Sequence, residues 1–503
     1  MSKVFAVGID GGSWNVFDYL IEKGVMPFLA GLKKKYPSGI CYSVIPPMSP
    51  PAWTSFLTGV LPGKHGIYGF SYKPADSYQY SRIHDGRDIS YPTIDKILKY
   101  YGKKTILVNI PMTFPPFKDA EVCISGMMSP SEKVDYIAPS FLRERFEKEG
   151  ITYRIDFPYK KKEIPSIVKK DNGETFTKTL LKIEYERMKA VLHLIKEFEW
   201  DVTCYAITMT DRLQHFLWNF IFAESSKNRK ITENVWRFYR GIDSILEKIY
   251  SQLNKEDKLI IFSDHGFGKY LGDFNVNRWL IKEGYLRRRK LWEIFYFYIL
   301  KKLGKRKGSS LIDYQKSKCY MANVDSLNVN LKGREKMGSV EMEEYYKVLK
   351  SVKESLLNLK YKGKKIIERV YLGKELYGDN SPDIFYEFKK DYLSHGYISQ
   401  IYNPCIILKS LKQGDHTREG IFLITEEPAQ EINLSIVDIL PVILTMTGCK
   451  IPSFIDGKLP KIIKEKVKEE IDHNFPFLPE EKIPSSEEIN QQVAEKLKSL
   501  GYM

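Results

Sequence analysis

Residues 258–268 read KLIIFSDHGFG. The apolar, β-branched run predicts a buried strand, and the two glycines that follow predict a sharp turn of the backbone. Asp264 and His265 stand between strand and turn, which places a carboxylate and an imidazole where a strand of the sheet ends. Taken alone, the pair is also compatible with a helix cap and a packing residue. At a strand end, however, these two side chains are a typical pair of metal ligands.

Similar apolar runs recur along the chain, with helical stretches between them. This alternation predicts an α/β fold in which helices cover both faces of a mainly parallel sheet. Ligands of such sheets bind beyond the carboxyl ends of the strands, so residues that follow the runs become candidate site residues. The runs are VFAVGI (4–9), TILVNI (105–110), VTCYAI (202–207), KLIIFS (258–263), PCIIL (404–408) and GIFLI (420–424).

Further carboxylates and imidazoles stand next to these runs. Asp10 follows the first run, and His416 precedes the last one. Asp211 and His215 follow the run at 202–207 and are four residues apart, so on a helix they share one face and can bind one metal ion together. Taken singly, Asp10 also fits a turn residue, whereas a solvated helix face is the commoner explanation of Asp211 and His215 and an ordinary loop histidine that of His416. Together they form a set typical of a two-metal site for phosphoryl transfer.

Residues 44–59 read VIPPMSPPAWTSFLTG, with four prolines close together. Proline fixes φ and donates no hydrogen bond, so this stretch predicts a shaped turn. Pro51 suits the first turn of a helix that continues through Trp53, which puts Ser49 just outside the helix N-terminus, where free N–H groups favour an anion. A serine hydroxyl bound to a metal there becomes an alkoxide-like nucleophile.

The chain has 503 residues and a formal net charge of +15, which favours anionic partners: phosphorylated metabolites, nucleic acid or a lipid surface. No nucleic-acid-binding motif accompanies the charge, so no specific nucleic-acid binding is expected. Six scattered cysteines give neither a zinc ribbon nor a disulfide framework. No apolar run approaches the roughly 20 residues that span a bilayer, and no signal peptide is evident, so we expect a cytoplasmic protein.

Changes in composition and in the pattern of apolar runs along the chain predict three regions. Residues 1–284 and 391–460 are expected to form the core, 285–390 an inserted α+β module that acts as a cap or accessory element, and 461–503 a tail that ends in a short helix. The segment 285–308 is basic at both ends and aromatic in the middle. It is interpreted either as a solvated cover or as an amphipathic segment that contacts a membrane surface.

The motifs together resemble a known family. GIDGGSW, VIPPMSPPAWTSFLTGVLPGKHGI, TDRLQHF, FSDHGFG and GDHTREGIF occur in the order found in the type I phosphodiesterase/nucleotide pyrophosphatase branch of the alkaline phosphatase superfamily. The resemblance implies an alkaline-phosphatase-like core and a metal-dependent phosphohydrolase that acts through a phosphoserine intermediate. It also implies two divalent metal ions, zinc with manganese or iron as alternatives, and a phosphorylated small-molecule or nucleotide substrate.

The resemblance also assigns residues. Ser49 falls at the position of the family's nucleophile. The first ion would be held by Asp10, Ser49, Asp264 and His265, and the second by Asp211, His215 and His416. His395, in YLSHGYISQ, is the rival of His416 as the seventh ligand.

Two positions depart from the family pattern. Members that cleave nucleotide diesters carry asparagine where this chain has Ala52 and Phe70. The phosphate would then need another donor, and the candidates are the backbone N–H of Ala52 and the guanidinium groups of Arg212 and Arg334. The departure leaves open whether the substrate is a diester or a monoester. The alternatives to a phosphodiesterase are a phosphomonoesterase and a phosphate-transferring mutase. An alternative of a different class is a non-catalytic protein that binds a membrane surface.

Overall fold

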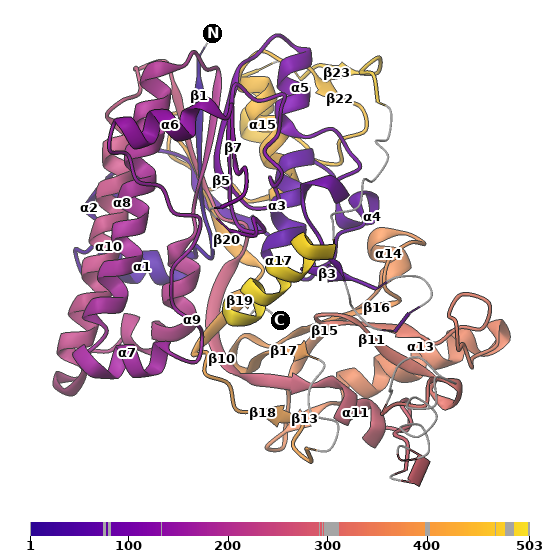
Figure 1. Cartoon of the computed structure of the whole chain (residues 1–503). Helices are drawn as coiled ribbons and strands as arrows, with labels where there is room; N and C mark the ends of the chain where they lie inside the picture. Colours follow the sequence, from indigo (N-terminus) through magenta and orange to yellow (C-terminus); the bar gives the residue numbers. More distant parts are fainter. Residues whose placement is uncertain are drawn as a thin grey trace. The chain divides into compact units, whose positions relative to one another are not determined.

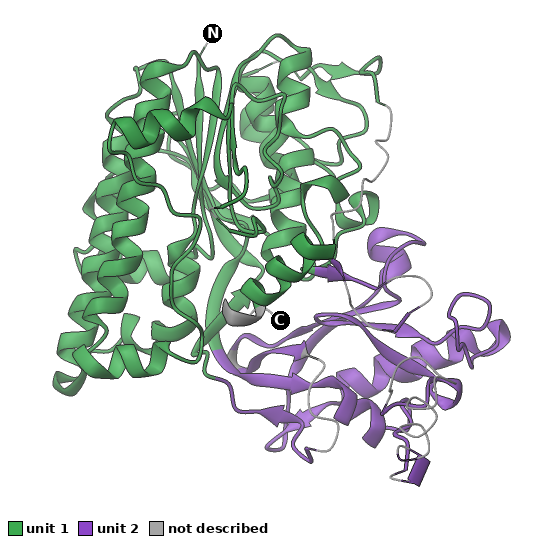
Figure 2. Ribbon diagram, viewed as in Figure 1, with its two compact units in different colours: residues 1–70, 83–269, 411–503 green, residues 71–82, 270–410 purple. Residues whose placement is uncertain are grey.

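The computed structural model divides the chain into two compact units (Figure 2). Unit 1 consists of residues 1–70, 83–269 and 411–503, and unit 2 of residues 71–82 and 270–410. The structure describes residues 2–73, 77–78, 82–131, 133–290, 292–293, 295, 311–397, 403–467, 469–477 and 487–500.

Unit 1 is built on a nine-stranded sheet (Figure 1). Five neighbouring strands at its centre, β9-β1-β8-β5-β6, are parallel, whereas β20 and β7 run antiparallel to their inner neighbours. The mainly parallel sheet predicted from the apolar runs is thereby confirmed. In sheet order the strands are β21 (Leu434–Ser435), β2 (Ser38–Tyr42), β20 (Glu419–Ile424), β9 (Lys258–Phe262), β1 (Val4–Ile9), β8 (Val202–Ile207), β5 (Thr105–Ile110), β6 (Val122–Ser125) and β7 (Ile137–Ala138).

Helices cover both faces of this sheet, as Figure 1 shows. Every residue of β1, β5 and β8 is buried, which is why these strands read as continuous apolar runs without alternation. On one face lie α1 (Trp14–Glu22), α2 (Pro27–Lys35), α8 (Glu174–Glu197), α9 (Met209–Ile221) and α10 (Arg229–Tyr250), and on the other α3 (Ser49–Thr58), α4 (Pro62–His65), α5 (Ile94–Tyr100) and α15 (Ile439–Met446). Unit 1 also contains α6 (Phe141–Lys148), α7 (Ile164–Asp171), α16 (Lys461–Lys464) and α17 (Glu487–Leu500).

The register of the central strands aligns their carboxyl ends. Ile9 pairs with Ile207, and Gly8 pairs with Phe262, so β1, β8 and β9 all end at the same edge of the sheet. The residues that follow these strands are therefore brought together, although they come from distant parts of the sequence.

Unit 2 has its own antiparallel sheet, in the order β11 (Cys319–Asn323), β12 (Ser326–Val329), β16 (Ile384–Phe388) and β15 (Ile367–Leu372). Its core packs apolar side chains of this sheet against α11 (Val276–Lys282) and α13 (Met342–Leu357), with Trp279, Leu327, Val352 and Ile384 among the buried residues. The long strand β10 (Gly266–Asn275) begins in unit 1 and continues into unit 2.

The short segment 71–82 also belongs to unit 2, which the sequence did not indicate. Within this segment, the Tyr78 ring stacks on Tyr314 with centroids 3.7 Å apart, and its hydroxyl donates to Asn330 Oδ1 at 2.6 Å. Long-range pairing of this kind has no signal in local periodicity, because it depends on which aromatic rings the folded unit brings together.

One strand prediction is wrong. PCIIL was expected in the main sheet, but only Ile407 and Leu408 form a strand, β18 (Ile407–Leu408), which pairs antiparallel with β10 in unit 2. Both residues are only half-buried, so the apolar run marks an edge of a small sheet and not a central strand. The role of residues 285–390 as a cap or accessory module stays a prediction.

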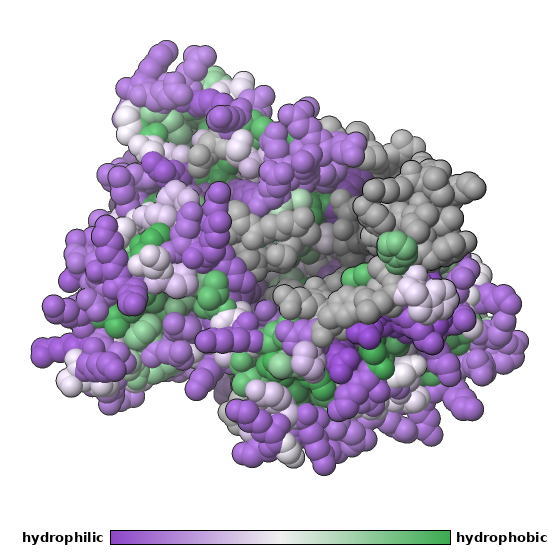
Figure 3. Space-filling model, turned by 60° about the horizontal axis from the view of Figure 1, so that its bottom comes forward, coloured by the Kyte–Doolittle hydropathy of each residue, from purple (hydrophilic) through white to green (hydrophobic). Residues whose placement is uncertain are grey.

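Most of the basic and aromatic segment 285–308 lies outside the described residues. Two of its side chains that are described, Trp292 and Phe295, are each 66% exposed. On the face seen in Figure 3, hydrophilic side chains predominate and apolar residues lie between them. Among the helices that the structure describes, none is long and apolar enough to cross a membrane.

Candidate metal centre

All seven predicted ligand residues meet at the carboxyl edge of the unit 1 sheet. Asp10 follows β1, Asp264 and His265 follow β9, and α9 carries the two candidate ligands Asp211 and His215 directly after β8. The remaining residues come from the start of α3 and from β19 (Gly414–Thr417), which pairs with the first residues of β10. Each of these side chains is at most 4% exposed: Asp10, Ser49, Asp211, His215, Asp264, His265 and His416.

A first group forms around His265. Its Nε2 lies 3.4 Å from Asp10 Oδ1, 3.2 Å from Asp264 Oδ2 and 3.4 Å from Ser49 Oγ. Asp264 is held in place by the backbone N–H of Gly11, which donates to Oδ1 at 3.2 Å. Two carboxylates, an imidazole and a hydroxyl therefore converge on one point.

A second group forms around His416. Its Nε2 lies 3.0 Å from Asp211 Oδ1 and 3.3 Å from His215 Nε2, and His215 Nε2 lies 3.2 Å from the same oxygen of Asp211. Donor atoms of Asp211, His265 and His416 also lie within 4.8 Å of one another, so the two groups are contiguous.

The three imidazoles are anchored in the same way. Each Nδ1 lies within hydrogen-bond distance of a backbone carbonyl oxygen: His215 at 2.9 Å from Gly414, His265 at 3.1 Å from Gly266, and His416 at 3.1 Å from Pro47. If Nδ1 carries the proton and donates it to the carbonyl, the lone pair of Nε2 points into the cluster. Metal-binding histidines are fixed in this manner.

The start of α9 is fixed by a buried carboxylate. Glu184 Oε1 accepts the backbone N–H groups of Thr208 and Met209, each at 2.9 Å, and the guanidinium of Arg187 at 2.9 Å. Glu184 Oε2 accepts the hydroxyl of Tyr205 at 2.8 Å. Because α9 begins at Met209, this network sets where Asp211 and His215 lie.

Burial governs the charges in the cluster. Burial and the neighbouring Asp264 raise the pKa of Asp10 well above its usual range, and burial raises the pKa of Asp264 to about 7. Burial opposes ionisation of Asp211 as well, yet His215 and His416 hold its pKa well below the usual value. Burial also lowers the pKa of all three histidines, that of His265 to about 4, so the imidazoles are neutral at neutral pH. Neutral imidazoles are the form that binds metal ions.

The donor set fits a bound cation. Asp10 Oδ1 and Asp264 Oδ2 are buried and have no hydrogen-bond partner among the described residues. Two buried carboxylate oxygens left without a donor would each cost free energy, because buried polar groups are normally satisfied. Oxygen and imidazole nitrogen ligands converging on these atoms suit zinc or a similar divalent transition metal.

Comparison with known proteins shows the family of the chain. The sequence profile of the type I phosphodiesterase/nucleotide pyrophosphatase family matches residues 4–415. The chain belongs to this family. As a member of the type I phosphodiesterase/nucleotide pyrophosphatase family, it is a metal-dependent hydrolase of phosphate esters.

Two solved structures of one enzyme, with TM-scores above 0.5, support the fold. The phosphonoacetate hydrolase of Sinorhizobium meliloti in complex with phosphonoformate superposes with a TM-score of 0.54 at 18% identity, over 89% of this chain and 96% of the other. The same enzyme with phosphonoacetate gives 0.55 at 16%, with the same coverage. Murine ectonucleotide pyrophosphatase/phosphodiesterase 5 with AMP gives 0.48 at 13%, over 90% of this chain and 96% of the other. No curated protein sequence matches the chain.

The two positions at which this family member lacks asparagine are both apolar and buried. Ala52 is 0% and Phe70 is 3% exposed. The helix α3 begins at Ser49, one residue earlier than the sequence predicted, and the Ala52 N–H donates within its first turn to the Met48 carbonyl at 3.1 Å. The Ala52 amide, one of the candidate phosphate donors, is thus engaged by the helix in this structure, and its contact with substrate stays a prediction. Pro50 and Pro51 have no N–H, so Ser49 supplies the one amide among the first three helical residues.

The two candidate arginines are held by carboxylates. Arg212 is 2% exposed and donates to Asp211 Oδ2 at 2.8 Å and to Asp156 Oδ2 at 3.1 Å. This geometry favours a role in positioning Asp211 over direct contact with substrate. In unit 2, Arg334 donates to both oxygens of Asp383, at 2.8 and 2.6 Å. Its contact with substrate stays a prediction.

His395, the rival ligand, belongs to unit 2, where its Nδ1 pairs with Asp325 Oδ2. The described groups of converging metal-ligand side chains contain His416 and not His395. They do contain one residue that the sequence reasoning missed, Asp415, which groups with His215 and His416. Its signal was visible: the dipeptide Asp415–His416 repeats the order of Asp264–His265.

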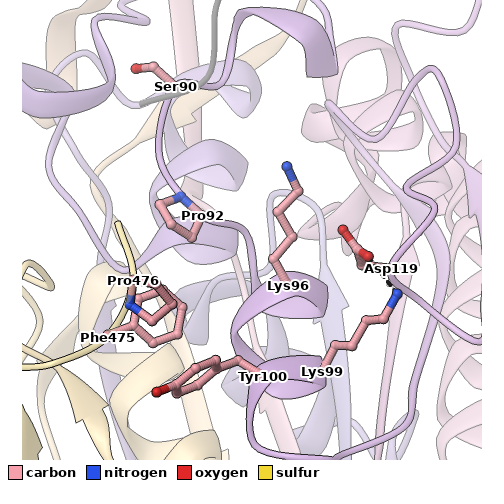
Figure 4. A pocket seen from close by; sticks show the side chains of 8 residues that line it. All are labelled: Ser90, Pro92, Lys96, Lys99, Tyr100, Asp119, Phe475 and Pro476. Carbon is pink, nitrogen blue, oxygen red and sulfur yellow. Dashed lines mark hydrogen bonds and ion pairs between the residues drawn. The ribbon is translucent and has the colours of Figure 1, made fainter. Parts of the chain in front are cut away.

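A surface pocket of about 460 Å³ elsewhere on unit 1 contains none of these residues (Figure 4). Helix α5 provides one wall, with Lys99 bonded to Asp119 at 2.7 Å, and Phe475 and Pro476 provide another. Its lining mixes two lysines, a serine and Asp119 with aromatic and proline residues, and none of the described groups of candidate metal ligands lies in it. The candidate metal ligands therefore lie at the sheet edge and not in this pocket.

Proposed function

We propose that the chain is a phosphodiesterase or nucleotide pyrophosphatase that transfers the substrate's phosphoryl group first to Ser49 and then to water. One observation carries the proposal. The buried hydroxyl of Ser49 lies at the first residue of α3 and 3.4 Å from His265 Nε2, at the point where two carboxylates without hydrogen-bond donors converge.

In this proposal Asp10, Ser49, Asp264 and His265 hold one divalent ion, and Asp211, His215 and His416 hold another. When bound, such ions lower the pKa of the serine hydroxyl and neutralise charge on the attacked phosphate and on the leaving oxygen. The imidazole and carboxylate donors favour zinc, with manganese or iron as alternatives.

The residues of the chain have defined tasks in the two steps. Ser49 Oγ forms a bond to phosphorus while the bond from phosphorus to the leaving oxygen breaks, and the departing alcohol or phosphate takes up a proton. The Oγ proton is lost to solvent. Water then attacks the same phosphorus, the bond to Oγ breaks, and the serine hydroxyl is restored.

Helix α3 prepares Ser49 for the first step. The N-terminus of a helix attracts an anion. At the N-terminus of α3, Ser49 provides both the proposed nucleophilic hydroxyl and a backbone N–H for this attraction. Pro50 and Pro51 restrict φ on the following residues, which reduces the freedom of the turn. Neighbouring hydroxyls are engaged elsewhere: Thr54 Oγ1 donates to the Pro50 carbonyl at 2.7 Å, and Ser55 Oγ lies 3.0 Å from His65 Nε2.

The substrate is a phosphorylated small molecule or nucleotide. Family membership favours a diester, whereas Ala52 and Phe70 remove the amide side chains that diester-cleaving members use. A phosphomonoesterase and a phosphate-transferring mutase use the same nucleophile, so the test has to separate them.

The test compares a chromogenic phosphodiester with the matching monoester, each incubated with zinc-loaded wild type and with Ser49→Ala. We expect faster turnover of the diester by the wild type, none by Ser49→Ala, and a trapped adduct on Ser49 by mass spectrometry after acid quenching. Preference for the monoester would replace the proposal with a phosphomonoesterase. Transfer to an added acceptor in place of water would indicate a mutase. A protein that purifies without divalent metal and turns over neither ester would be a non-catalytic binding protein.

A further inference from the structure

Asp415 and Lys412 form a buried pair beside the second group of ligands. They are 1% and 8% exposed, and Lys412 Nζ donates to Asp415 Oδ2 at 3.1 Å. The other carboxylate oxygen, Oδ1, accepts the backbone N–H of His416 at 3.0 Å. The Asp415 carboxylate thus connects the buried ammonium group of Lys412 to the backbone N–H of His416, which is a candidate metal ligand.

This carboxylate also faces the two imidazoles of the second group. Asp415 Oδ1 lies 3.6 Å from His416 Nε2 and 3.8 Å from His215 Nδ1. The segment is fixed to α9, because the Gln413 N–H donates to the His215 carbonyl at 2.6 Å and Gln413 Oε1 accepts the Asn219 N–H at 3.1 Å. Asp415 is therefore held at a fixed place beside both histidines.

The two groups differ in charge compensation. In the second group, Asp211 pairs with Arg212 at 2.8 Å and Asp415 pairs with Lys412, so each carboxylate has a cationic partner. In the first group, neither Asp10 nor Asp264 has a lysine or arginine ion pair within the described part of the chain. A divalent cation is attracted by uncompensated negative charge, and in a buried site this attraction is screened little.

We propose that Asp415 is a positioning residue for His215 and His416, and that Lys412 offsets its charge so that the second group binds its divalent ion more weakly than the first. The inference rests on the proposed two-metal function. It assigns opposite effects to the two members of one ion pair: loss of the lysine charge strengthens binding at the second group, and loss of the carboxylate charge weakens it.

The experiment is a Zn²⁺ titration of metal-stripped protein against a competing chelator, with native mass spectrometry to count bound ions. Wild type is expected to bind two ions in two separable steps. Lys412→Met should tighten the weaker step and Asp415→Asn should weaken it, each by about tenfold or more, as one unit charge near a divalent ion implies at an effective dielectric constant of about 20. Asn keeps an oxygen for the His416 N–H, so this change isolates the charge.

Three matched variants complete the experiment. Lys412→Arg keeps the positive charge and should retain the wild-type affinity of the weaker step. In the double variant Lys412→Met/Asp415→Asn the two effects should offset each other, so that its affinity is close to that of the wild type. Lys103→Met removes a lysine that pairs with Asp201 at 3.5 Å where β5 and β8 begin, at the opposite edge of the sheet, and should leave both steps unchanged.

The outcomes separate the inference from the function on which it rests. If wild type binds two ions but both single variants shift the weaker step in the same direction, or neither shifts it, the pair has only a structural role and the inference is wrong. If the tighter step responds in place of the weaker one, the assignment of strong and weak groups is wrong. If wild type binds fewer than two ions, the two-metal function itself fails, and the inference fails with it.

Discussion

The imidazole rings of His265 and His416 stack on one another, with centroids 3.7 Å apart and planes inclined by 21°. The Nε2 atoms of the two rings face different carboxylates. His265 Nε2 faces Asp10 and Asp264, and His416 Nε2 faces Asp211. The stacked pair is therefore the shared wall between the two ligand groups. Both rings are neutral, because burial lowers their pKa, and two neutral rings stack without charge repulsion.

This arrangement predicts separable metal losses. Asp264→Ala should empty the group that contains Ser49, and His416→Ala should empty mainly the other, because each removes a ligand facing one group. Metal content per chain, measured by plasma mass spectrometry after dialysis, should fall from about two to about one in both variants, as expected for a two-metal site. His395→Ala, outside the ligand groups, should keep the wild-type content. Loss of metal in His395→Ala and not in His416→Ala would reverse the assignment.

Substitutions of Ser49 test the nucleophile. Ser49→Thr should retain partial turnover, since a secondary alkoxide can still attack, while the extra methyl group is restricted at χ1 in a tight turn. Ser55→Ala, in the same helix, is the matched control: its hydroxyl lies against His65, so turnover should stay near the wild-type rate. The N-cap of α3 is Met48 and no side-chain hydrogen bond caps the helix, so loss of the Ser49 hydroxyl should leave the helix and the fold in place. Substantial turnover by metal-loaded Ser49→Ala would therefore show that another group attacks.

The buried network at the start of α9 should be important for stability. Glu184→Gln leaves the Arg187 charge unpaired in the interior, where both side chains are 0% exposed, and should lower the free energy of unfolding by about 3 kcal/mol. Urea denaturation measures this loss. Glu186→Gln, on the same helix and with only long ion pairs of 3.8 and 3.9 Å, should cost less than about 0.5 kcal/mol. Equal losses in the two variants would contradict the special role of Glu184.

Asp95 should make stability depend on pH. Burial raises its pKa to about 6 from the usual value of 3.8. The folded state then binds the proton more tightly than the unfolded state, so stability is highest below the unfolded pKa and falls as pH rises to about 6. At pH 7.5 the cost is about 3 kcal/mol.

Asp95→Asn removes this titration. It should flatten the decline between pH 4 and 6 and raise the free energy of unfolding at pH 7.5 by up to the same amount. Asp18→Asn, which alters a surface ion pair with Lys33 and does not act on Asp95, is the control and should leave the pH profile intact. A profile unchanged by Asp95→Asn would show that other groups control acid stability.

Contact with anionic membranes through 285–308 remains a prediction with a direct test. Trp292 and Phe295 are each 66% exposed, and basic residues precede them in the sequence. Wild type should sediment with vesicles that contain phosphatidylserine, less so at high salt, because exposed charges are screened. A variant with both aromatic residues changed to alanine should bind more weakly. Equal sedimentation with neutral vesicles would exclude the electrostatic part of the prediction.

The sequence by itself determined five of the nine strands of the main sheet, β1, β5, β8, β9 and β20, and its motifs, through their resemblance to a family, indicated the seven candidate ligands. Continuous apolar runs such as 4–9 and 258–263 are typical of strands buried on both faces, and Asp10 and Asp264 come directly after them, so their place at the sheet edge follows from local chain order. The spacing of Asp211 and His215 likewise fixes them on one helix face, since the helical repeat is independent of the rest of the fold.

Only the tertiary structure decided the remaining features. Which sheet PCIIL joins, the inclusion of residues 71–82 in unit 2, and the use of the Ala52 amide within α3 depend on contacts between residues far apart or on where a helix starts. The pairing of Lys412 with Asp415 and of Arg212 with Asp156 belongs to this class as well. Buried ion pairs form where packing excludes water from two opposite charges, and no periodicity along a chain records which charges will meet.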